Sequence, residues 1–173
     1  MSSDALTDLA LRAQDGDRVA LSDFVRATQD DVWRVCAHLT SPAQADDVVQ
    51  DVYLRALRAL PRFRGDSSAR TWLLAIARHT AIDSVRAAVR RRRLLTRTPP
   101  VEDTPDTAGG ADLTALVATL DPDRRSAFVL TQVVGCSYEE AAEICACPVG
   151  TIRSRVARAR GDLVDALRRA EAT

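Results

Sequence analysis

The chain contains no lysine, because all 24 of its basic side chains are arginine, a bias that codon usage in a GC-rich genome explains. It also has no apolar run of the roughly 18 residues that a membrane-spanning helix needs. The first residues, MSSDALTDLALRAQDGD, lack the basic and then apolar layout of a secretory signal. These absences predict a soluble cytoplasmic protein with no membrane insertion.

Cysteine and histidine are scarce. There are two histidines, neither in a metal-ligand or catalytic spacing, and four cysteines: Cys36, Cys136, Cys145 and Cys147. Only the last two cysteines are close together, and no nearby histidine completes a set of metal ligands. We therefore predict no metal, no cofactor and no catalytic residue, with the cysteines acting as small buried side chains. A metal- or thiol-based redox sensor that uses the last three cysteines is the alternative.

The formal net charge of zero hides an uneven distribution of charge. Residues 1–97 carry 16 arginines against 12 acids, residues 98–123 carry none against six, and residues 124–173 carry eight against six. Two mildly basic blocks therefore flank an acidic segment. The neutral total does not argue against a nucleic-acid partner.

The acidic segment also divides the chain. Residues 96–111 are rich in proline, glycine, threonine and acids, which is typical of a flexible linker. The remainder has apolar residues at helical spacing and almost no alternation typical of strands. We predict an all-α protein with two small helical domains, residues 1–95 and 112–173, joined by a flexible linker.

The segment ADDVVQDVYLRALRAL in the first domain predicts a helix with one apolar side. The opposite side collects Asp47, Gln50, Asp51, Leu54 and Arg58. Leu54 is a large aliphatic side chain among charges. It is either a harmless exposed leucine or the apolar centre of a contact site with a polar rim.

A loop, LPRFRGDSSARTW, precedes the next predicted helix, whose outer side carries Thr71, Trp72, Arg78, His79 and Arg86. An aromatic ring beside arginines suits single-stranded nucleic acid, because the ring stacks on bases and guanidinium groups hold phosphates. Alternatively, Trp72 closes the edge of the hydrophobic core.

The second domain contains the pattern of a helix-turn-helix. Ser137 and Glu140 form a capping box that starts one helix, and Pro148 marks the start of the next after a very short connection. Two helices joined so tightly, the second of them basic, predict a DNA-binding motif.

The basic helix, GTIRSRVARAR, has three kinds of face. Ile152, Val156, Ala159 and Leu163 form a stripe that must face the core. Arginines flank the stripe on both shoulders, and the outward positions between them are small: Gly150, Thr151, Ser154, Ala157 and Gly161. Small outward residues let the helix approach closely, while the arginines reach both phosphate walls of a major groove. No acid stands between Thr151 and Arg160 to pair with them.

Two long motifs in the sequence resemble one known protein family. ADDVVQDVYLRALRALPRFRGDSSARTWLLAIARHTAIDSVR and LTQVVGCSYEEAAEICACPVGTIRSRVARAR resemble the extracytoplasmic-function (ECF) sigma factors of the bacterial sigma-70 family. The resemblance covers about residues 5–93 and 112–168. The lysine-free composition resembles actinobacterial proteins, and the expected branch is of the sigma-C type.

The resemblance implies a transcription initiation factor that is not an enzyme. It would bind core RNA polymerase, direct it to the minus-ten and minus-35 promoter elements, and promote melting. Residues 1–95 would be the region 2 domain and residues 112–173 the region 4 domain, which also touches the beta flap. The linker would thread through the polymerase. Residues matching the positions that dock on the beta-prime clamp helices are Asp47, Gln50, Asp51, Leu54 and Arg55.

The resemblance also implies two sets of promoter contacts. The minus-ten set, which captures an unstacked base and holds the melted strand, is Phe63, Arg64, Asp66, Ser67, Trp72, Arg78, His79 and Arg86. The minus-35 set is Thr151, Arg153, Ser154, Arg155, Arg158 and Arg160. An anti-sigma factor that covers these faces is a candidate partner. A free-standing helix-turn-helix regulator with a ligand-sensing domain is the rival interpretation.

Overall fold

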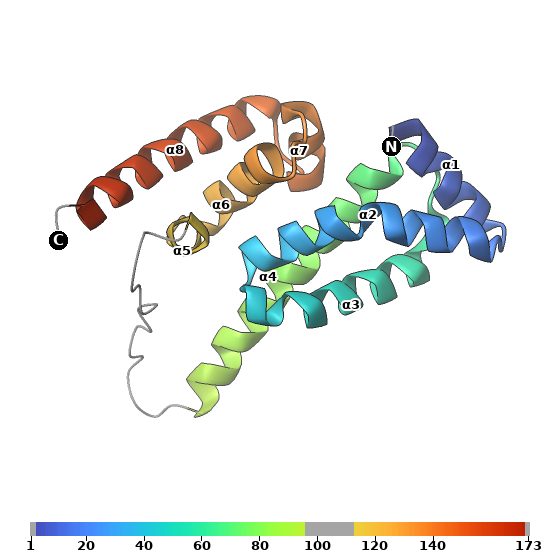
Figure 1. Cartoon of the computed structure of the whole chain (residues 1–173), viewed down its shortest axis with the longest axis horizontal. Helices are drawn as coiled ribbons and strands as arrows, with labels where there is room; N and C mark the ends of the chain where they lie inside the picture. The colour runs from blue at the N-terminus through green and yellow to red at the C-terminus, as the bar shows by residue number, and fades with distance from the viewer. Residues whose placement is uncertain (1–2, 96–112, 172–173) are drawn as a thin grey trace.

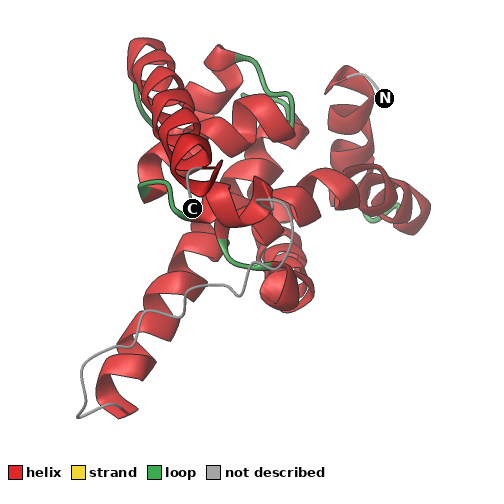
Figure 2. Ribbon diagram, turned by 60° about the vertical axis from the view of Figure 1, so that its left-hand side comes forward, coloured by secondary structure: helices red, strands yellow, loops and turns green. Residues whose placement is uncertain are grey.

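The fold is entirely helical in the computed structural model, which describes residues 3–95 and 113–171 (Figures 1 and 2). The first group of helices is α1 (Ser3–Gln14), α2 (Arg18–Leu39), α3 (Pro42–Ala59), a 3₁₀ turn (Leu60–Arg62) and α4 (Ala69–Leu95). The second is α5 (Leu113–Ala118), α6 (Pro122–Phe128), a π-helical turn (Val129–Val133), α7 (Tyr138–Cys145) and α8 (Val149–Glu171). The described ranges contain no strand, which confirms the all-α prediction. The predicted linker lies outside them.

The first group encloses its own hydrophobic core. Buried side chains at helical spacing on α2, α3 and α4 meet there, among them Val32, Val35, Val52 and Leu73. One buried polar contact joins α2 to α3, where the hydroxyl groups of Thr28 and Tyr53 are 2.9 Å apart. Each hydroxyl group thus has a hydrogen-bond partner, without which its burial would cost free energy. The contact therefore fixes the rotation of α3 about its own axis, so that the side opposite the core faces solvent.

The second group forms the predicted helix-turn-helix around a smaller core. The Ser137 hydroxyl accepts a hydrogen bond from the Glu140 amide at 3.0 Å, and the Glu140 carboxylate accepts one from the Ser137 amide at 2.7 Å. This confirms the capping box. Helix α7 ends at Cys145, and the capping residue Ala146, with a φ of 50°, reverses the chain in the left-handed region. Only residues 146–148 separate α7 from α8, as the sequence predicted.

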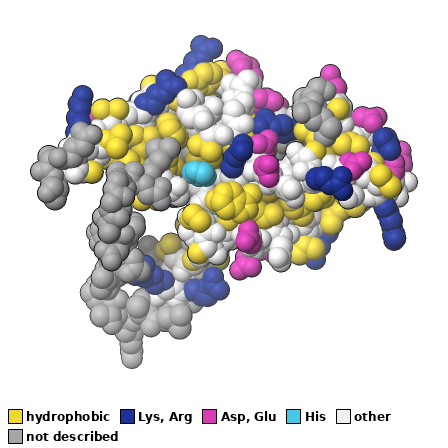
Figure 3. Space-filling model, in the orientation of Figure 1, with side chains coloured by type: hydrophobic (Ala, Val, Ile, Leu, Met, Phe, Trp, Pro, Cys, Tyr) yellow, Lys and Arg dark blue, Asp and Glu magenta, His cyan; other side chains and the backbone are white. Residues whose placement is uncertain are grey.

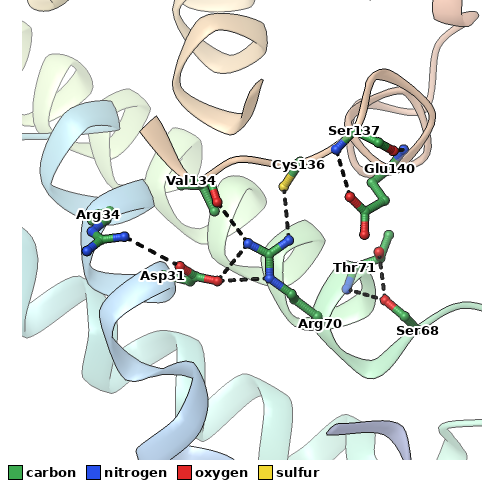
Figure 4. A network of polar contacts seen from close by, with 9 residues as sticks. All are labelled: Asp31, Arg34, Ser68, Arg70, Thr71, Val134, Cys136, Ser137 and Glu140. Carbon is green, nitrogen blue, oxygen red and sulfur yellow. Dashed lines mark hydrogen bonds and ion pairs between the residues drawn. The ribbon is translucent and has the colours of Figure 1, made fainter. Parts of the chain in front are cut away.

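The two groups pack against each other, α4 against α7, which the sequence analysis did not predict. Arg70 on α4 is central to this contact (Figure 4). Its guanidinium donates to the Asp31 carboxylate at 2.8 Å, to the Val134 carbonyl at 2.9 Å and to Cys136 Sγ at 3.6 Å. Leu74, one turn further along α4, is 1% exposed. Helix α4 therefore has a second buried side that belongs to the contact between the groups.

Candidate polymerase and nucleic-acid interfaces

The outer face of α3 carries all five side chains of the predicted polymerase-binding set. Asp47, Gln50, Asp51, Leu54 and Arg55 are exposed, while the opposite side of the helix is buried in the core. Leu54 is 53% exposed, which is high for a large aliphatic side chain in a folded chain. The structure therefore presents a leucine at the centre of a charged face, the geometry of an apolar anchor with a polar rim.

Two exposed hydrophobic residues near this face are not among the predicted contacts. Leu57 lies one turn beyond Leu54 on α3 and is 43% exposed. Trp33 on α2 is 41% exposed, and its indole nitrogen donates to the Asp46 carboxylate at 3.0 Å. Figure 3 shows hydrophobic side chains gathered over α2, with acidic side chains next to them toward α3. The helical spacing of Leu57 from Leu54 could have identified it, since both fall on the outer side.

A pocket of about 270 Å³ lies in the loop before α4. Its lining includes all four predicted loop residues, Trp72 of α4, and two residues that the prediction lacked, Arg62 and Gly65. The lining residues are Arg62, Phe63, Arg64, Gly65, Asp66, Ser67 and Trp72. The Phe63 and Trp72 rings lie against each other with centroids 5.0 Å apart. Trp72 thus both borders the core and lines the pocket, so the two alternatives for this residue are compatible.

The loop is tied to the rest of the first group by side chains of α1. The Gln14 amide donates to the carbonyl of Leu60 at 3.1 Å and to that of Phe63 at 3.0 Å. The Thr7 hydroxyl accepts from the Ala69 amide at 3.1 Å. A pocket with such supports is formed before any ligand arrives, which lowers the entropic cost of binding.

The outer side of α4 differs from its prediction. His79 and Arg86 are exposed and Trp72 is half-buried, but Thr71 and Arg78 are only 3% and 8% exposed. Thr71 is engaged at the start of α4, where Ser68 Oγ accepts from its amide at 3.1 Å and donates to its hydroxyl at 2.9 Å. Arg78 is covered because the second group lies over this part of α4, close to Asp123 of α6.

Helix α8 has the three faces that the sequence predicted. The stripe of Ile152, Val156, Ala159 and Leu163 is at most 7% exposed. Among the predicted minus-35 residues, Arg153, Ser154, Arg158 and Arg160 are exposed, whereas Thr151 and Arg155 are half-buried.

Two of the arginines in the predicted minus-35 set already have partners. The Arg155 guanidinium forms an ion pair with the Asp123 carboxylate and donates to Cys147 Sγ at 3.6 Å. Arg160 donates to the side-chain carbonyl of Gln132 at 2.7 Å. Within the predicted minus-35 set, Arg153 and Arg158 are therefore the more accessible arginines, one on each side of the helix.

The cysteines do not form a reactive site. All four are free thiols, with Cys36, Cys136 and Cys145 buried as predicted and Cys147 half-buried. Burial raises the pKa of Cys36 to about 12 and that of Cys136 to about 11, so both are protonated thiols at neutral pH. No group of three or more candidate metal ligands occurs in residues 3–95 and 113–171. The geometry thus does not favour the redox-sensor alternative.

No helix within the described ranges is both long enough and apolar enough to cross a membrane.

Comparison with known proteins relates both helical groups to one family. Residues 24–91 match the model of sigma-70 region 2, and residues 111–163 match that of sigma-70 region 4. The chain is 51% identical to the probable RNA polymerase sigma-C factor of Mycobacterium bovis, over 93% of this chain and 90% of the relative. It is 36% identical to the ECF RNA polymerase sigma-E factor of Escherichia coli, over 91% and 93%.

Two solved structures share the fold. One is described as CnrH in complex with the cytosolic domain of CnrY, with a TM-score of 0.73, 26% identity and coverage of 94% of this chain and 97% of that one. The other is the sigma factor RpoE of Bartonella quintana in complex with the anti-sigma factor NepR, with a TM-score of 0.71, 30% identity and coverage of 86% and 96%. The chain therefore belongs to the ECF sigma factors of the sigma-70 family and serves transcription initiation.

Proposed function

We propose that three separate surfaces of this sigma factor divide the work of initiation: the outer face of α3 binds core RNA polymerase, the loop pocket with α4 handles the minus-ten element, and α8 reads the minus-35 element. Residues 1–95 would act as region 2, residues 96–111 as the linker and residues 112–173 as region 4. The observation that carries the proposal is that one chain exposes all three surfaces. The opposite sides of the helices that bear them are buried in the hydrophobic core.

The α3 face would dock on the clamp helices of the beta-prime subunit. Leu54 supplies the apolar centre, and Asp47, Gln50, Asp51 and Arg55 supply the polar rim. Arg55 also donates to the Asp83 carboxylate of α4 at 3.0 Å, which orients its guanidinium before binding. Interfaces of this kind depend on a desolvated anchor surrounded by groups that exclude water.

The loop pocket would receive one unstacked base of the minus-ten element. Phe63 and Trp72 offer aromatic surface, and Arg64, Asp66 and Ser67 offer polar groups at the rim. His79 and Arg86, exposed further along α4, would follow the backbone of the melted strand. Unstacking a base costs a few kcal/mol, which stacking and hydrogen bonds in such a pocket offset.

Helix α8 would enter the major groove of the minus-35 element. Its outward ridge of Thr151, Ser154 and Ala157 is small, so Arg153 and Arg158 can reach base edges or phosphates on either side. In contrast, a solvated helix of no function would pair its arginines with acids along its own surface.

Arg158→Ala is expected to weaken binding to the minus-35 element by about 1–3 kcal/mol if the side chain reads a base. Arg158 is exposed on α8, so the substitution leaves the core intact. The measurement is the affinity of the polymerase holoenzyme for promoter DNA and for the same DNA with its minus-35 element scrambled. An equal loss on both would mean that Arg158 contacts a phosphate instead.

The protein would work in the cytoplasm, catalysing no reaction of its own. Both solved relatives are held by a second protein, one of them described as an anti-sigma factor. An anti-sigma factor that covers the α3 face or α4 is therefore a reasonable partner for this chain.

In vitro transcription with core RNA polymerase on genomic fragments tests the proposal. We expect transcripts that start only when the chain is added, from sites that share a two-part upstream sequence. A free-standing helix-turn-helix regulator, the rival function, would bind DNA without polymerase and would give no such transcripts. It also leaves the exposed Leu54 unexplained.

A further inference from the structure

The loop that joins α3 to α4 is held at both of its ends by one helix, α1, which lies beside it (Figure 1). At the start of the loop, the side-chain amide of Gln14 donates to the carbonyls of Leu60 and Phe63, at 3.1 and 3.0 Å. At its end, the Thr7 hydroxyl accepts from the Ala69 amide at 3.1 Å. Thr7 and Gln14 are two helical turns apart, so both lie on the same side of α1.

These side chains satisfy backbone groups that helices leave unpaired. The Phe63 carbonyl lies just beyond the 3₁₀ turn, and the Ala69 amide is the first of α4. Both residues are buried. A buried backbone group that loses its partner costs free energy, so the chain pays for any movement that breaks either contact. The two ends of the loop are therefore fixed relative to α1.

Between its two ends the loop has little else to define its shape. Residues 64–67 make no hydrogen bond or ion pair with any other residue of the ranges that the structure describes. These four residues line the pocket, together with the aromatic rings of Phe63 and Trp72. The distance between the loop wall and Trp72 thus depends on the contacts at the two ends and on the packing of the two rings.

Helix α1 is itself a firm support. The side chains of Leu6 and Ala10 anchor it in the hydrophobic core of the first group. At its C-terminal end, Arg12 donates at 2.7 Å to the carboxylate of Asp17, whose side chain also caps the first turn of α2. The position of α1 is therefore set by the core and by α2, independently of the loop that it holds.

We propose that Thr7 and Gln14 are positioning residues for base capture, which set the distance between the loop and Trp72 so that one unstacked base fits the pocket. The inference rests on the role proposed above for the pocket. The lining of the pocket includes neither side chain, so both act through the loop backbone and not by contact with DNA. A base gains its full stacking energy only if the opposite wall of the pocket is already in place.

The test measures how much one base contributes to binding. The probe is the non-template strand of a promoter found by the transcription experiment, with a series of the same strand in which one nucleotide at a time is abasic. Fluorescence anisotropy with the polymerase holoenzyme gives the ratio of affinities for the intact and each abasic strand. Phosphate contacts are the same in both strands and cancel in this ratio. A loss of folded protein lowers both affinities equally and cancels as well.

For the wild type, we expect one abasic position to weaken binding by about tenfold, the factor that a stacked base contributes. Gln14→Glu replaces the donor with a carboxylate that faces two carbonyls, so the ratio at this position should fall to about threefold or less. Gln29→Glu is the matched control, because it makes the same change of charge at an exposed site on α2. It should keep the tenfold ratio.

Thr7→Val tests the contact at the other end of the loop. Valine has nearly the shape of threonine but cannot accept the hydrogen bond from the buried Ala69 amide. The ratio should fall in the same direction as in Gln14→Glu. This variant decides the outcome if Gln14→Glu fails to assemble with core polymerase.

A wild-type ratio in Gln14→Glu, or in Thr7→Val where Gln14→Glu does not assemble, would overturn the proposal. The loop would then keep the pocket in shape without α1. A wild-type holoenzyme that shows no sensitive position would instead contradict the proposed role of the pocket. The two failures are therefore distinguished by the wild-type measurement alone.

Discussion

Leu54→Asp is expected to abolish binding of the chain to core RNA polymerase while leaving its fold intact. The Leu54 side chain is 53% exposed, so its replacement should change the free energy of unfolding by no more than about 0.5 kcal/mol. On binding, burial of a leucine contributes about 1.5–3 kcal/mol, and a carboxylate in its place must be desolvated without a partner. Co-purification with core polymerase measures binding, and thermal unfolding monitors the fold.

Val19→Asp is the matched control for this experiment. Val19 is 68% exposed in the first turn of α2, away from the outer face of α3, and the change again places a carboxylate on an apolar surface site. The control should bind polymerase as the wild type does. Undiminished co-purification of Leu54→Asp would contradict the proposed role of the α3 face.

Features that depend on one helix could be predicted from the sequence. The buried stripe of α8 and the exposed face of α3 follow from helical periodicity, because each helix turns its apolar residues toward its own small core. The capping box of Ser137 and Glu140 is likewise a local pattern, in which both partners lie within four residues.

Burial on the second side of α4 could not be predicted in this way. The sequence places Arg78 on the same outer side of α4 as His79 and Arg86. Arg78 is nevertheless covered, because the second group of helices lies over it. Its partner Asp123 is 45 residues away, beyond the predicted linker, so no local pattern joins the two. Packing between domains depends on such pairs, and treating the domains as independent led to the error for Arg78. Thr71 is instead engaged by Ser68 at the start of α4.

Trp72→Ala is expected to impair opening of the promoter more than binding to core polymerase. The substitution removes one wall of the loop pocket and the ring that lies against Phe63. Stacking of a base on an aromatic side chain contributes about 1–3 kcal/mol, so the population of open complex should fall by roughly one order of magnitude. Permanganate reactivity of unpaired thymines in the holoenzyme–promoter complex measures this population.

Trp72→Phe separates stacking from packing. Because Trp72 is half-buried, its truncation to alanine also lowers the stability of the first group, whereas phenylalanine retains a ring at the same site. We expect Trp72→Phe to restore most of the open complex and both variants to co-purify with core polymerase. If Trp72→Ala opened the promoter as well as the wild type, the pocket would not receive a base. If Trp72→Ala also failed to co-purify with core polymerase, the defect would lie in folding of the first group, because the α3 face is built on the same core.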